Sequence, residues 1–250
     1  MRESKDVKKL ILLGIFAIAM GFLEAVVVVY LRKLYYPGGF AFPLGAVPAK
    51  ILSIELLREI TTIIMLLCIA LIAGKGSLQY VTFFIYTFGV WDIFYYIALK
   101  VLLNWPVSLF TWDILFLIPV PWVGPVLAPL LCSVVMILFA CGIIYLQGKG
   151  YAVAMKLHEW CFLLFGFFLI FCTFIRDYST MIIRGGFLHE FFNLATNERF
   201  QEVTSRYVPV SYNWIVFIIG ELCILSALVM VIKRSGLIDK YKKVKKTKGK

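Results

Sequence analysis

Residues 9–31 read KLILLGIFAIAMGFLEAVVVVYL, and this apolar run predicts a membrane protein. A helix needs about 20 apolar residues to cross roughly 30 Å of hydrocarbon, and this run is long enough. Ala17-Ile18-Ala19 resembles the cleavage site of a secretory signal peptide, but the run continues to Val29. We therefore expect an uncleaved membrane-spanning helix.

Five further runs of this kind follow along the chain. Its 250 residues are 62% hydrophobic and 16% charged, with a mean hydropathy of +0.93. A soluble domain has about 45–50% apolar and about 25% charged residues, so an ordinary globular enzyme, a disordered chain and a disulfide-rich secreted module are excluded. We predict an all-α integral membrane protein, a bundle of about six transmembrane helices. The expected spans are 9–31, 55–74, 79–103, 124–147, 157–178 and 212–233.

The cysteines and histidines predict no cofactor and no metal site. All six cysteines lie in apolar runs without a CxxC pair, which argues against a zinc site or a redox dithiol. His158 and His189 fall at opposite sides of the predicted membrane, so they cannot share a haem or a metal. The sequence also lacks DDxxD, HExxH and GxSxG patterns, and we assign no catalytic residue.

The distribution of lysine and arginine predicts the orientation. An even number of spans places both ends of the chain on one side, and basic residues mark the cytoplasmic side. The segment from Lys233 onward holds nine of the 25 Lys and Arg, and without it the two sides tie at seven each. We expect a multi-pass cell membrane protein with both termini cytoplasmic.

The net charge of +11 is explained by a membrane surface better than by nucleic acid. Residues 1–233 are expected to form a single polytopic membrane domain. Residues 234–250 are expected to form a basic cytoplasmic tail that faces anionic lipid. Nucleic acid is not an expected partner, because no folded basic domain is present to shape a groove.

Two segments outside the spans carry structure of their own. Residues 104–125, NWPVSLFTWDILFLIPVPWVGP, have an apolar core too short to cross a membrane and end in three prolines. They predict a broken, re-entrant or interfacial helix at about 107–119. Mixed charges and aromatic residues at about 186–206 predict an amphipathic helix on the outer surface.

Charged side chains gather in the outer half of the predicted bundle. An ionisable group at membrane depth costs at least about 2.5–3.5 kcal/mol, so it needs a partner or a function. Within 55–59 three charged residues fall at i, i+3 and i+4, and within 92–100 an Asp, a Tyr and a Lys fall at i, i+4 and i+8. We predict a polar chamber under the outer surface. Its expected residues are Glu24, Glu55, Arg58, Glu59, Asp92, Tyr96, Lys100, Asp113 and Glu221.

Three functions are compatible with such a chamber. The first is a small-solute or ion transporter, or a channel-like protein. The second is a non-catalytic subunit or anchor of a larger membrane complex, in which the charges fix the packing of the helices. The third is a membrane-embedded enzyme that acts on a lipid-linked substrate. A chain this short lacks the 10–12 spans of many transporters, so we expect a homo-oligomer or partner membrane subunits.

Overall fold

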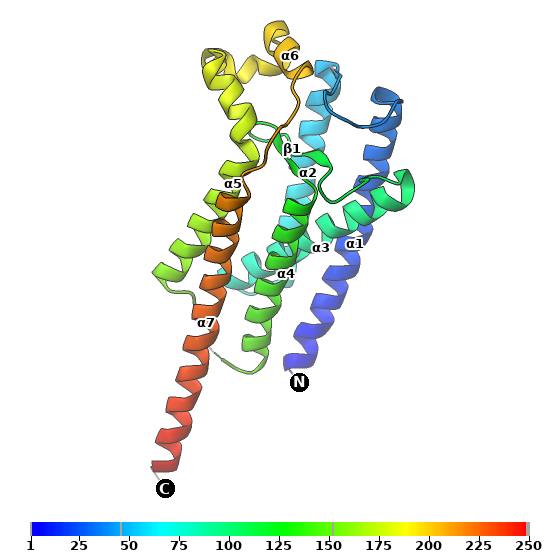
Figure 1. Ribbon diagram of the computed structural model, residues 1–250. Helices are drawn as coiled ribbons and strands as arrows, with labels where there is room; N and C mark the ends of the chain where they lie inside the picture. The colour runs from blue at the N-terminus through cyan, green and yellow to red at the C-terminus, as the bar shows by residue number, and fades with distance from the viewer. Residues whose placement is uncertain (1, 46, 152, 249–250) are drawn as a thin grey trace.

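Six helices are long and apolar enough to cross a membrane (Figure 1). The computed structural model describes residues 2–45, 47–151 and 153–248. An all-α membrane protein with six spans is therefore confirmed, and each span overlaps its predicted range. In chain order the elements are α1 (Arg2–Tyr35), α2 (Ala49–Ala73), α3 (Ser77–Leu103), β1 (Trp112–Phe116), β2 (Trp122–Pro125), α4 (Leu127–Gly148), α5 (Leu157–Arg184), η1 (Phe187–Thr196), α6 (Glu198–Ser205) and α7 (Trp214–Lys248).

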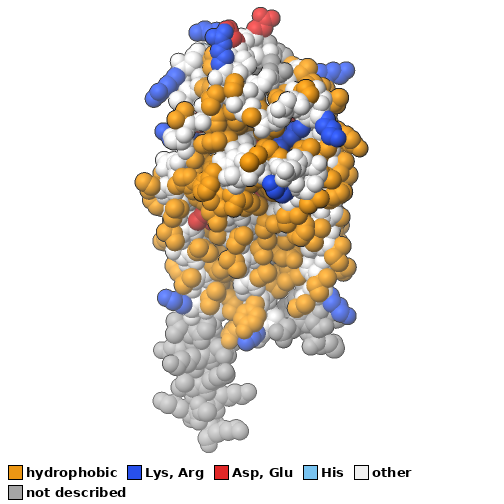
Figure 2. Space-filling model, turned by 45° about the vertical axis from the view of Figure 1, so that its right-hand side comes forward, with side chains coloured by type: hydrophobic (Ala, Val, Ile, Leu, Met, Phe, Trp, Pro, Cys, Tyr) orange, Lys and Arg blue, Asp and Glu red, His pale blue; other side chains and the backbone are white. Residues whose placement is uncertain are grey.

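The outside of the bundle is apolar over the height of the spans. Figure 2 shows a broad band of hydrophobic side chains, with lysines and arginines above and below it. Large apolar side chains such as Leu12, Ile72 and Val101 are exposed on the isolated chain. Several acidic side chains, including Glu24 and Asp92, are buried. This arrangement suits a bilayer, in which the solvent is hydrocarbon and the charges face the interior of the bundle.

The two ends of the bundle differ. Figure 1 shows both chain termini at one end, below α4, and α6 at the other end. We call these the terminal end and the loop end. The last helix, α7, continues without a break from its membrane span to Lys248, so the described part of the predicted tail, 234–248, has a helical backbone.

Close contacts between backbones hold the helices together. The helix α3 packs against α1, α2 and α4, while α5 and α7 pack along each other. A Cβ atom at Gly21 of α1 would lie 2.6 Å from the carbonyl oxygen of Trp91 in α3, and one at Gly166 of α5 would lie 2.5 Å from that of Gly220 in α7. Membrane helices associate through such small residues, because lipid supplies no hydrophobic force between them.

Gly21→Ala is expected to lower the free energy of unfolding by about 1–3 kcal/mol, as overpacking of a filled interior does. The added methyl group would meet backbone, which cannot rotate away, so α1 must move from α3. Thermal unfolding of the full chain in detergent measures the effect. Gly38→Ala is the control, because a Cβ atom there meets nothing within 4 Å. Equal melting temperatures for the two variants would show that the helices are not in close contact at Gly21.

Residues 107–119 do not form the predicted helix. They contribute β1, which pairs with β2 in a short antiparallel hairpin, with Asp113 opposite Gly124. The physical reason lies in the residue types. Pro119 and Pro121 fall between the strands, where a missing N–H and a fixed φ end regular structure, and the flanking aromatic and branched residues favour strands. An isolated two-stranded hairpin is marginal in stability, so this one depends on its contacts with the helices.

The predicted surface helix at 186–206 is present as two shorter helices, η1 and α6. Asn197 separates them, and its side chain accepts a hydrogen bond at 2.8 Å from the N–H of Phe200. This is the N-cap interaction that starts a new helix. Phe187 of η1 and Phe200 of α6 are buried in one cluster with Tyr178 of α5. The amphipathic prediction therefore located the segment but missed its break.

Candidate functional site

A cavity of about 180 Å³ lies between α1, α2, α3 and β1, in the half of the bundle toward the loop end. One water molecule needs roughly 10–15 Å³ of such space, so the cavity has room for a small molecule. Of the nine residues predicted for a polar chamber, seven line it. They are Glu24, Glu55, Arg58, Glu59, Asp92, Tyr96 and Asp113.

Arg58 of α2 joins two of these carboxylates. Its guanidinium group pairs with Glu24 of α1 and with Glu55, one turn earlier in α2. Thr62, one turn later, donates a hydrogen bond to the other oxygen of Glu24. The spacing i, i+3 and i+7 places the three α2 residues on one helix face. Since α1 and α2 pack mainly against α3, these side chains bridge the gap between them.

Asp113 of β1 is the most deeply buried carboxylate of the cavity, at 1% exposure. It accepts hydrogen bonds from Arg32 Nη2 at 3.1 Å, from Tyr96 Oη at 3.0 Å and from the N–H of Ile114 at 3.0 Å. Burial raises the pKa of Asp113, and the Arg32 guanidinium and the hydrogen bonds oppose this rise. The contacts attach the hairpin to α1 and α3.

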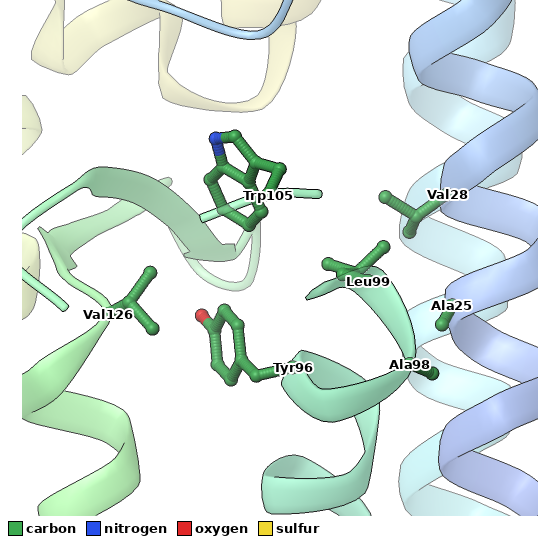
Figure 3. Packing of buried hydrophobic residues seen from close by; sticks show 7 residues of the cluster. All are labelled: Ala25, Val28, Tyr96, Ala98, Leu99, Trp105 and Val126. Atoms are coloured by element: carbon green, nitrogen blue, oxygen red, sulfur yellow. The ribbon is translucent and has the colours of Figure 1, made fainter. Parts of the chain in front are cut away.

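Arg32 is a cavity residue that the sequence did not reveal. It follows an apolar run, as an ordinary flanking cation does. Its guanidinium carbon lies 4.0 Å from the centre of the Phe40 ring and 3.7 Å from the centre of the Trp105 ring, within the range of cation–π attraction. Figure 3 shows Trp105 above Leu99, in an apolar cluster beside α1. The sequence contained only an indirect signal for Arg32. Asp113, in the segment that forms the hairpin, is an acidic residue that requires a cationic partner.

Two carboxylates of the cavity, Glu59 and Asp92, form no ion pair in the part of the chain that the structure describes. Glu59 Oε2 accepts a hydrogen bond from the N–H of Leu117 at 2.9 Å, and Asp92 Oδ2 accepts one from Ser133 Oγ at 2.8 Å. Both side chains are buried, at 7% and 9% exposure. The sequence did not single out Ser133, because a serine in an apolar helix carries no distinctive signal. The cavity lining thus carries a formal excess of negative charge, five carboxylates against two guanidinium groups.

Aromatic rings form another part of the lining. The ring of Trp91 lies 6.3 Å from that of Tyr95 and 6.2 Å from that of Phe116, and all three residues border the cavity. Trp91 and Tyr95 come from α3, whereas Phe116 comes from the hairpin. Aromatic faces attract cations, most strongly where water is excluded.

Lys100 and Glu221 were predicted for the chamber but do not line the cavity. Lys100 follows Asp92 by eight residues, so its side chain has turned about 80° around α3. Its Nζ donates to the carbonyl of Pro106 at 3.0 Å. Glu221 belongs to α7, which packs against α4 and α5 and does not border the cavity. It is buried beside Cys132.

The half of the bundle toward the terminal end is different. Its buried acid, Glu159, pairs with Arg234 at 2.9 Å and accepts the N–H of Lys156 at 2.7 Å. Glu159 lies in the first turn of α5, and its side chain is fully buried. A hollow of about 320 Å³ in this half is lined by Lys75, Gln79 and Gln147 and by no acidic side chain of the described ranges, and apolar clusters form the interior around it. The two halves therefore differ in the acidic lining of their hollows.

The chain matches no protein family, no curated protein and no solved structure. A likeness to another protein therefore does not favour one of the three functions over the others. The volume, charge and lining of the cavity remain as the basis for a proposal.

Proposed function

We propose that the chain binds a small organic cation in this cavity, as the recognition step of transport across the membrane. The observation that carries the proposal is the formal excess of carboxyl groups over guanidinium groups, five against two, around a space of about 180 Å³. Each of the two arginines is already paired with a carboxylate. A bound cation would therefore meet the remaining acids, Glu59 and Asp92.

The chemistry of the lining favours an amine over an inorganic metal ion. In the described residues, no group of three or more His, Cys, Asp or Glu side chains has the geometry to hold a metal. An ammonium group instead combines charge-assisted hydrogen bonds to carboxylates with attraction to aromatic faces. Glu59 and Asp92 supply the first interaction, and Trp91, Tyr95 and Phe116 supply the second.

The side from which the cation enters follows from the predicted orientation. The cavity lies toward the loop end, opposite the two termini. With both termini in the cytoplasm, as the basic segment after Lys233 predicts, the cation would enter from outside the cell. The hollow that the structure describes in the other half is lined by Lys75, Gln79 and Gln147 and by no acidic side chain, which favours a gated binding site over an open channel.

Small amines are expected to stabilise the full chain against heat. A ligand at about 100 times its Kd adds about 2.7 kcal/mol to the free energy of unfolding. Glu59→Gln and Asp92→Asn should each weaken amine binding roughly tenfold to a hundredfold, because each removes a charged acceptor worth about 1.5–3 kcal/mol. The measurement is the melting temperature of the detergent-solubilised chain in concentration series of ethylammonium, choline and putrescine.

Glu202→Gln is the matched control. Glu202 lies on α6 and pairs with Arg206, and its side chain is 64% exposed, so this variant should bind amines as the unmodified chain does. Propanol and acetate, which are neutral and anionic compounds of similar size, should not stabilise the chain. The proposal fails if these compounds stabilise as well as the amines, or if both cavity variants bind amines normally.

Transport requires a separate measurement. Vesicles that contain the purified chain should take up the amine that stabilises it most. Binding without uptake would support the proposed cation site and contradict the proposed transport. Stoichiometric partner chains in native mass spectrometry would then favour the alternative, a membrane subunit of a larger complex.

A further inference from the structure

A second polar hollow lies outside the proposed cation site, where the last turns of α5 meet the chain that leads from α6 to α7. Figure 1 shows this connecting segment running down alongside α5. The hollow has a volume of about 390 Å³. Its lining residues are Arg176, Asp177, Thr180, Arg184, Tyr207, Val208, Val210 and Ser211.

Positive charge from α5 dominates this hollow. Arg176, Thr180 and Arg184 follow one another at intervals of four residues along α5, and all three line the hollow. Neither arginine takes part in an ion pair within the residues that the structure describes, and both are exposed. The one acid of the lining, Asp177, accepts a hydrogen bond from the hydroxyl group of Tyr207. Two guanidinium groups therefore face one carboxylate.

The length of α5 sets the depth of the hollow. This helix has 28 residues, which corresponds to about 42 Å at 1.5 Å per residue. A bilayer is about 30 Å thick in its hydrocarbon and about 40–45 Å with its headgroups. The last turns of α5, with Arg184, therefore lie at the level of the lipid headgroups on the loop side. Exposed apolar side chains beside them, Ile183 and Val210, suit the adjoining acyl chains.

We propose that this hollow binds the phosphate group of an anionic lipid in the leaflet on the loop side. A guanidinium group offers parallel N–H donors that match two oxygens of a phosphate, and two such groups line the hollow. Ser211, in the segment between α6 and α7, adds a hydroxyl group to the lining. The site is distinct from the basic tail, which extends from the terminal end.

Native mass spectrometry of the full chain in detergent, titrated with phosphatidylglycerol, tests the proposal. Attraction to anionic lipid is worth about 1 kcal/mol per basic residue, so Arg184→Gln should weaken binding about fivefold and Arg176→Gln/Arg184→Gln about thirtyfold. Arg176→Lys/Arg184→Lys keeps both charges but loses the parallel donors, and its affinity should lie between those of the unmodified chain and the double glutamine variant. Melting temperatures show whether each variant is folded. If the double glutamine variant does not fold, the loss of affinity in the double lysine variant tests the proposal.

Lys50→Gln is the control, because it removes an exposed charge on α2 at the same end of the bundle. It should leave binding of phosphatidylglycerol unchanged. A loss equal to that of Arg184→Gln would mean diffuse surface attraction, and the proposed site would be wrong. Arginine-dependent binding of inorganic phosphate as tight as that of phosphatidylglycerol would assign the hollow to the free ion and overturn the lipid assignment. Equal binding of phosphatidylcholine would overturn the preference for an anionic lipid.

Discussion

Arg58→Met is expected to destabilise the folded chain by about 3–5 kcal/mol. Breaking a buried ion pair by removing one partner costs this much, because the other charge stays buried without compensation. Here the loss is shared by two carboxylates, since Arg58 pairs with both Glu24 and Glu55. Glu24 is 5% exposed and lies inside a membrane span.

Arg206→Met is the control for this prediction, since it breaks another Arg–Glu pair of the same chain. The side chains of Arg206 and Glu202 are 78% and 64% exposed, and such a pair contributes about 0–1 kcal/mol. Thermal unfolding in detergent should therefore separate the two variants clearly. Adding Glu24→Gln to Arg58→Met should restore part of the lost stability. Similar melting temperatures for the two single variants would contradict the ion-pair network of the cavity.

Asp113→Asn is expected to have an effect of similar size, about 3–5 kcal/mol, for a different structural reason. It leaves Arg32 charged and buried, with side-chain exposures of 9% and 2% for the two partners. It also replaces one of the two acceptor oxygens that hold the hairpin to α1 and α3 by an NH2 group, which cannot accept a hydrogen bond. We therefore expect the segment 104–126 to become accessible to protease before the helices unfold.

The double variant Arg32→Met/Asp113→Leu tests this explanation directly. Well-packed apolar residues replace a buried ion pair with little loss, so most of the stability should return. Lys33→Met is the control, because Lys33 is exposed and next to Arg32 in the sequence. The explanation fails if the double variant is no more stable than Asp113→Asn, or if protease never cleaves the hairpin segment early.

The membrane spans were predictable because their signal is local. A run such as 9–31 needs no knowledge of its neighbours, since lipid covers whatever the bundle does not. The α2 stripe was predictable for a related reason. The period of a helix fixes which residues share a face. The prediction that Glu55, Arg58 and Glu59 face the same side of α2 therefore required no knowledge of the tertiary structure.

The remaining parts of the site depend on contacts between distant segments. The hairpin forms because proline chemistry and cross-strand pairing outweigh the apolar run at 107–119. The ion pair of Arg32 is with Asp113, 81 residues later in the chain. Lys100 and Glu221 were misplaced because depth in a membrane does not say which neighbour a side chain faces. The rotation of each helix and the identity of its neighbours decide which side chains it faces, and the sequence of a single span determines neither.

The pairing pattern of the cavity has a consequence for synthesis. Glu24 lies inside the first span, and its cation, Arg58, belongs to the very next one. Two helices are therefore enough to neutralise this acid while later segments are still on the ribosome. Arg32 waits much longer for Asp113, but it lies in the last turn of α1, where a long side chain can reach water in the meantime. In these two pairs, the deeper charge has the earlier partner, which lowers the cost of inserting the chain helix by helix.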